Sequence, residues 1–156
     1  MKRAHLLVAA APLLVLCSPV HSSAQALPYK NGSVWEMTFI RIKPGMELDY
    51  LNNLRANWRR LLDEEKKQGL VTSYKVIESD AANPDDWNTL LLVEYPSMAI
   101  MDSLDEKVNT MATKMFGTPT QQRAQATQRG DMRVIMGTKL GREVVLRDTT
   151  VTASRP

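Results

Sequence analysis

The chain has 156 residues, a formal net charge of +3 at pH 7, one cysteine and two histidines. That length allows one domain with a core of its own, but it is short for two domains. The small net charge gives no electrostatic reason to expect a nucleic acid as a partner.

The N-terminal segment has the layout of a secretory signal peptide. Two basic residues precede an apolar run over 6–16, and a polar stretch ends in Ala-Gln-Ala at 24–26. We expect cleavage after Ala26 and a periplasmic or secreted protein. The apolar run is about 11 residues long, whereas a helix that spans a bilayer needs roughly 20. We therefore expect no stable membrane anchor after cleavage.

Cleavage would remove every cysteine and histidine, because Cys17, His5 and His21 all lie in this segment. Residues 27–156 could then form no disulfide, thiolate nucleophile, Ser-His-Asp triad, histidine-ligated haem or usual zinc site. We therefore predict no metal and no cofactor. The lack of disulfides also favours a bacterial periplasm over eukaryotic secretion.

A strand and a long helix come first in chain order. The segment 33–43 is rich in β-branched and aromatic residues, and Trp35 and Phe39 share one face, which predicts a strand. From 46 to 68 the apolar residues recur at helical spacing on one side. We predict that this helix ends at Gly69, since glycine is the usual residue just beyond a helix C-terminus.

The rest of the chain predicts three strands and two helices. We place the strands at 70–78, 87–95 and 142–148, and the helices at 97–116 and 119–128. Residues 129–140 fit no single pattern. The segment 27–32 is expected to be an N-terminal lead, and 149–156 a disordered tail.

This order, β-α-β-β-α-(α)-β, predicts an α+β, ferredoxin-like domain over 33–148, with a four-stranded antiparallel sheet and its helices on one face. The strand at 87–95 is apolar on both faces, so both sides of the sheet should be covered. A second copy of the sheet would cover the helix-free side. We therefore expect a homodimer.

Four segments resemble small exported bacterial proteins of the dimeric α+β barrel superfamily: FIRIKPGMELDYLNNLRANW, KKQGLVTSYKVI, NPDDWNTLLLVEY and GTKLGREVVLRD. The resemblance spans roughly Val34 to Asp148. It implies two sheets packed face to face in a homodimer, and a pocket between the helices and the sheet of each subunit. The superfamily includes cofactor-free quinone monooxygenases, haem-degrading enzymes, isomerases and proteins of no known activity. The haem-degrading members use a histidine ligand, which residues 27–156 lack.

Five residues are candidates for the lining of such a pocket. Cofactor-free monooxygenases of the superfamily use asparagine and tryptophan, and Asn57 and Trp58 have these side chains. Trp58 could instead anchor the helix on the sheet, and Asn57 could be a surface amide. Arg41 could pair across the dimer, and the hydroxyls of Tyr74 and Tyr95 could meet a backbone carbonyl rather than a ligand.

Three hypotheses for the function follow. The first is a protein that binds a small apolar or aromatic molecule. The second is a cofactor-independent monooxygenase or isomerase acting on a quinone-like or aromatic substrate. The third is a structural or interaction protein in which the dimer itself is the functional surface. The first two predict a pocket near Asn57, Trp58 and Tyr74, whereas the third predicts a filled core there.

Overall fold

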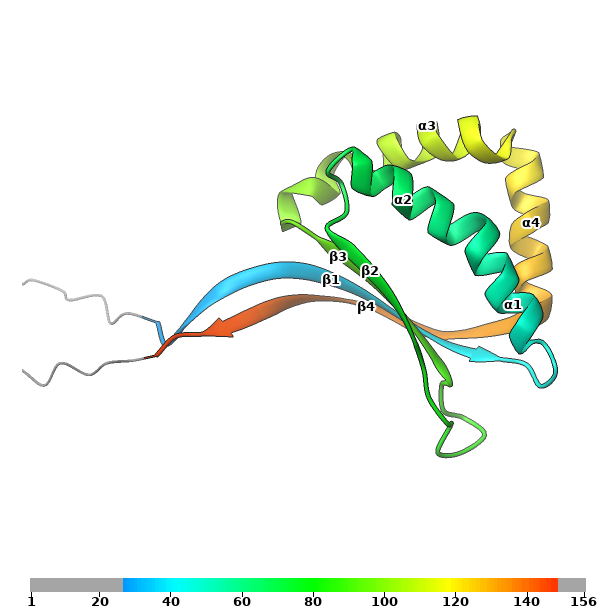
Figure 1. Ribbon diagram of the computed structural model, residues 1–156, viewed down its shortest axis with the longest axis horizontal. Helices are drawn as coiled ribbons and strands as arrows, with labels where there is room; N and C mark the ends of the chain where they lie inside the picture. The colour runs from blue at the N-terminus through cyan, green and yellow to red at the C-terminus, as the bar shows by residue number, and fades with distance from the viewer. Residues whose placement is uncertain (1–26, 149–156) are drawn as a thin grey trace, which may run out of the picture.

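The computed structural model describes residues 27–148, which form an antiparallel sheet with a layer of helices on one face (Figure 1). The elements in chain order are β1 (Tyr29–Ile42), α1 (Glu47–Asn53), the π-helical segment η1 (Leu54–Trp58), α2 (Arg59–Lys67), β2 (Ser73–Glu78), β3 (Thr89–Tyr95), the 3-10 segment η2 (Met98–Ser103), α3 (Leu104–Phe116), α4 (Pro119–Met132) and β4 (Arg133–Leu146). The predicted signal peptide at 1–26 and the predicted tail at 149–156 lie outside the described residues. Within 27–148, no helix has both the length and the apolar character needed to cross a bilayer.

The four strands lie in the order β2-β3-β1-β4, and every neighbouring pair is antiparallel. This is the strand order of a ferredoxin-like split βαβ fold. The predicted α+β class and the four-stranded antiparallel sheet are therefore confirmed. The two ends of the sheet, β2 and β4, do not pair with each other, so a single chain does not close a barrel.

The first and last strands in the chain, β1 and β4, are longer than the sequence patterns predict. β1 begins at Tyr29 rather than at Ser33, and β4 begins at Arg133 rather than at Arg142. The two strands pair along their whole lengths, with bulges that shift the register at two points. Residues 129–140 fit no single pattern because they span the end of α4 and the start of β4, and β4 is bulged and mostly exposed.

The predicted helix at 46–68 is confirmed, with one change of geometry in its middle. α1 and α2 are continuous through η1, in which the backbone adopts π-helical hydrogen bonding. Gly69 ends the run with a φ of +72°, a left-handed conformation in which a side chain would be strained. The role predicted for Gly69 is thus confirmed.

The second helical region differs from its prediction at both ends. Residues 98–103 form the 3-10 segment η2 before α3 starts at Leu104. The Ser97 side chain makes no capping hydrogen bond to η2 or to α3. α4 begins as expected at Pro119, where Thr118 and Gln121 form a reciprocal capping box. The helix then continues to Met132, four residues beyond the predicted end.

The core lies between the helices and one face of the sheet. Side chains of β1 and β3 alternate, and those turned toward the helices are the buried ones, such as Val34, Ile40, Leu91 and Val93. The alternate residues face away from the helices, with Leu92 paired to Met37 at the centre of that face. The expectation that strand 87–95 is covered on both faces is therefore met on only one face within a single chain.

Candidate functional site

A cavity of about 230 Å³ lies inside the helix layer, where the middle of the first long helix meets α3, α4 and the start of β4. Ten residues line it: Leu54, Asn57, Trp58, Leu61, Ala112, Phe116, Gln122, Gln125, Arg129 and Arg133. The volume is below the roughly 300–1,000 Å³ of pockets that hold drug-sized molecules, so the cavity suits a small compound of one or two rings.

The π-helical segment η1 supplies three of the lining residues. Leu54, Asn57 and Trp58 all fall within it. A π-helical turn is wider than an α-helical turn, and such single turns are frequent at functional sites. The change in backbone geometry therefore coincides with the cavity and with two of the candidate residues.

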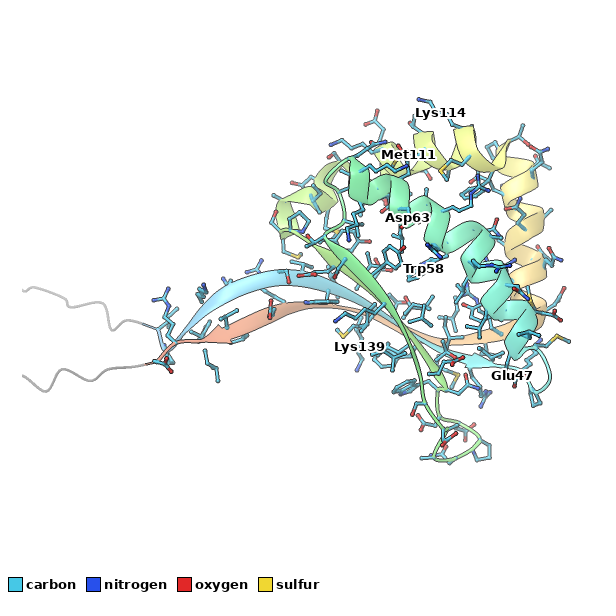
Figure 2. The ribbon with its side chains drawn as sticks, viewed as in Figure 1. Glu47, Trp58, Asp63, Met111, Lys114 and Lys139 are labelled. Atoms are coloured by element: carbon cyan, nitrogen blue, oxygen red, sulfur yellow. The ribbon has the colours of Figure 1, made fainter. Side chains whose placement is uncertain are left out.

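Trp58 joins the cavity to both halves of the core. It packs against the cluster under α3 and against the cluster around Tyr50 and Ile40. Figure 2 shows it between α2 and the sheet. Its ring meets the Tyr74 ring edge to face, with centroids 5.3 Å apart and an interplanar angle of 79°. Trp58 thus both anchors the helix and forms part of the cavity wall.

Asn57 has one defined hydrogen bond. Its side-chain nitrogen donates to the backbone carbonyl of Asn53, one turn earlier, over 3.2 Å. This bond orients the amide and leaves its oxygen free of any protein donor within residues 27–148. The neighbouring Asn53 has a buried side-chain oxygen that also lacks a donor among the described residues. Asn53 is not part of the cavity lining, so only the Asn57 oxygen is placed to accept a hydrogen bond from a molecule in the cavity.

The polar end of the cavity contains two arginines, from α4 and from the first position of β4. Arg133 donates a hydrogen bond to the Tyr50 hydroxyl, and its guanidinium lies 5.2 Å from the centroid of the Tyr50 ring. Burial raises the pKa of Tyr50, and the charge of Arg133 works against that rise. Burial, and then the positive charge of Arg133, lower the pKa of Arg129.

The five candidate residues from the sequence do not all meet at one place. Asn57 and Trp58 line the cavity together. Tyr74 touches Trp58 but is not in the lining, and its hydroxyl donates to Asp63 over 2.5 Å. Tyr95 is buried in the core and donates to Glu36 over 3.3 Å. Arg41 faces away from the helices and lies 3.9 Å from the exposed carboxylate of Asp85.

The lining residues from α4 and β4 do not appear among the sequence candidates. Gln122, Gln125 and Arg129 follow one another at intervals of three and four residues, which places them on one helix face. That spacing was a usable signal. Arg129 and Arg133, in contrast, fall in the segment 129–140, which fits no single pattern in the sequence.

A second feature lies on the opposite side of the sheet. A shallow, mostly apolar depression of about 330 Å³ is lined by Trp35, Met37, Leu92, Gly141, Arg142 and Glu143. Lys75 lies 5.7 Å from the Trp35 ring centroid, and Lys139 lies 5.7 Å from that of Phe39. Figure 2 shows Lys139 on the side of the sheet away from the helices. This face is flatter and more open than the cavity in the helix layer.

Comparison with known proteins gives structural neighbours only. No protein-family model matches the chain, and no curated protein sequence matches it. A dimeric ferredoxin-like protein from an uncultured marine organism aligns with a TM-score of 0.47 and 15% sequence identity, over 75% of this chain and 90% of that chain. A protein from Shewanella oneidensis aligns with a TM-score of 0.46 and 12% identity, over 75% of this chain and 98% of that chain.

A further neighbour is a dimeric ferredoxin-like protein of unknown function from Jannaschia sp. CCS1. It aligns with a TM-score of 0.41 and 14% identity, over 72% of this chain and 98% of that chain. Two of these three neighbours are described as dimeric ferredoxin-like proteins.

Proposed function

We propose that the protein binds a small apolar or aromatic molecule in the cavity of the helix layer. The observation that carries the proposal is the combination of an apolar wall with a few polar side chains in one concave, partly open space. Small-molecule sites have this composition, because apolar contact gives affinity and a few polar groups fix orientation. The third hypothesis, a purely structural protein, predicts a filled core at Asn57 and Trp58, so a cavity at these residues favours binding.

A cavity-filling substitution tests the proposal. Ala112 is buried and lines the cavity, so Ala112→Leu adds apolar atoms to the space that a ligand would occupy. We expect naphthalene-2-carboxylate to bind the unaltered protein in isothermal titration calorimetry and to lose that binding in Ala112→Leu. Ala124→Leu is the matched control, because Ala124 is exposed on α4. Equal binding to both variants would contradict the proposal, provided that their circular dichroism spectra are native.

A second candidate is a cofactor-independent oxygenase or isomerase acting on an aromatic or quinone-like substrate. The observation that favours it is the position of Asn57, whose amide is oriented by Asn53 beside Trp58 in the cavity. Such an amide can orient a substrate that supplies its own reducing power. Oxygen uptake with a panel of phenols and quinols, abolished by Asn57→Ala, would support this activity over simple binding.

We also propose that the protein acts as a homodimer outside the cytoplasm. The helix-free face of the sheet supports the dimer, since Trp35, Met37 and Leu92 form an apolar depression there. The pattern of residues 1–26 supports export. Cell fractionation and N-terminal sequencing test the second point, and we expect an exported chain that starts at Leu27.

A further inference from the structure

Arg129 and Arg133 bring two positive charges to one end of the cavity without an acidic partner in the described part of the chain. The ion pairs within residues 27–148 join Arg41 to Asp85, Arg59 to Asp63 and Lys67 to Glu64. None of them includes either cavity arginine. Both side chains are only partly exposed, so water screens their charges less than it screens those of surface arginines.

Without a bound ligand, the placement of these two like charges near each other is energetically unfavourable. An arginine side chain stays protonated in proteins, so it cannot relieve the repulsion by losing its proton. The lowered pKa of Arg129 has two causes, loss of solvation and the charge of Arg133, and both disfavour the charged form. The C-terminal carbonyls of α4 attract cations, but the carbonyl of Gly130 already accepts a hydrogen bond from Lys43.

The Arg133 guanidinium is held in place before any ligand arrives. Its hydrogen bond to the Tyr50 hydroxyl and its position over the Tyr50 ring fix one side of the planar guanidinium group. Tyr50 itself is fully buried, with 0% of its surface exposed, so it gives a rigid support. A preorganised guanidinium is suited to a carboxylate, because its parallel N–H groups match the two oxygens.

The other eight lining residues of the cavity carry no charge. Gln122 and Gln125 lie on the same face of α4 as Arg129, and the rings of Trp58 and Phe116 supply the apolar wall. We propose that the ligand is an amphipathic anion, an aromatic carboxylate whose carboxyl group meets Arg129 and Arg133 and whose ring lies against Trp58. This inference rests on the proposed binding function and specifies its ligand class.

A matched pair of probes tests the inference. Naphthalene-2-carboxylate and naphthalene-2-methanol share the same rings, and only the first carries a charge. We expect the carboxylate to bind the unaltered protein at least about tenfold more tightly, which corresponds to one charge-assisted hydrogen bond. Arg129→Gln should remove most of that preference, and Arg129→Lys should keep part of it. Arg123→Gln is the control, since Arg123 is exposed on the same helix.

The outcomes separate the inference from the function on which it rests. If both probes bind equally well, or if the preference survives in Arg129→Gln and in Arg133→Gln, the protein binds apolar molecules but the anion site is wrong. If neither probe binds, the cavity is not a binding site, and the proposed function and the inference both fall. Native circular dichroism spectra of the variants exclude loss of folding as the cause of lost binding.

Discussion

Glu65 is a buried carboxyl group with only 3% of its surface exposed, and none of the ion pairs of residues 27–148 includes it. Burial, with a contribution from the negative charge of Glu36, raises its pKa to about 7. The hydroxyl of Tyr95 lies in the same region and donates to Glu36. A carboxyl group in such surroundings is held in its protonated form to a higher pH than in the unfolded chain.

The raised pKa of Glu65 predicts a loss of stability as the pH rises. At a pH below the unfolded value of 4.5, Glu65 is protonated in both states. Between 4.5 and about 7 the unfolded chain loses the proton first, so unfolding becomes more favourable by about 1.4 kcal/mol per pH unit, or about 3 kcal/mol in total. Glu65→Gln removes this dependence. Urea unfolding should therefore show the variant gaining stability relative to the unaltered protein across this range.

A neighbouring variant controls for the general effect of a removed charge. Glu64 lies on the same helix, and its pKa is lowered by hydrogen bonds from Lys67 and Gln68. Glu64→Gln should therefore not reproduce the gain of Glu65→Gln toward neutral pH. An identical pH dependence in the unaltered protein and Glu65→Gln would contradict the assignment of a raised pKa to Glu65.

Replacement by alanine should change the free energy of unfolding with opposite signs at two glycines, one just beyond α2 and one within α4. Gly69 has a φ of +72° and open space around its α-carbon, so the cost of Gly69→Ala is that of the left-handed backbone, about 1 kcal/mol. Gly130 lies within α4, where an added β-carbon would meet no atom within 4 Å apart from its chain neighbours and the backbone of its own helix, so Gly130→Ala should stabilise by roughly 0.5–1 kcal/mol. Thermal unfolding of both variants measures the difference, and equal shifts in Tm would contradict it.

The π-helical segment η1 supplies three of the four cavity-lining residues of the first long helix. Ala56 is exposed in the middle of this segment. Deletion of Ala56 should convert the wide turn to an ordinary α-helical turn while α1 and α2 keep the faces that they bury. We expect a folded protein that no longer binds naphthalene-2-carboxylate, as measured by calorimetry.

Deletion of Glu64 from α2 is the matched control for this prediction. That segment has no wide turn to absorb the loss, so the residues beyond it would rotate by about 100° and move Glu65 out of its buried position. We expect a large loss of stability in this variant. If deletion of Ala56 destabilises the protein as much as deletion of Glu64, the extra width of η1 is required by the fold and not by the cavity.

The sequence predicts most elements because their patterns follow from local geometry. The apolar stripe of the first helix, its ending at Gly69 and the start of α4 at Pro119 all depend on neighbouring residues, and all are confirmed. η1 has no such local signal, since a π-helical turn depends on what packs around it. The cavity likewise depends on three helices meeting β4. Asn57 and Trp58 are candidates through the resemblance to the dimeric α+β barrel superfamily, whereas no local pattern identifies Arg133.

The face of the sheet that carries no helices is the largest part of the molecule left uncovered within one chain. The helices cover only one side (Figure 1), and the depression on the other side is mostly apolar. Phe39 and Trp87 also pack edge to face there, with ring centroids 5.7 Å apart. A monomeric protein rarely exposes a continuous apolar patch of this kind, so we expect a second copy of the chain to cover it.

This expectation predicts a dimer that one substitution on the helix-free face can separate. Leu92 lies at its centre, paired with Met37 and Lys75, so Leu92→Lys would place a further positive charge in the interface. We expect light scattering to give a dimer mass for the protein and a monomer mass for Leu92→Lys. Val76→Lys is the control, because Val76 is an exposed strand residue on the other face of the sheet.

A monomer mass for the unaltered protein would exclude the dimer. So would a Tm that stays constant with protein concentration, because a dimer that is more stable than its subunits unfolds at higher temperature as the concentration rises.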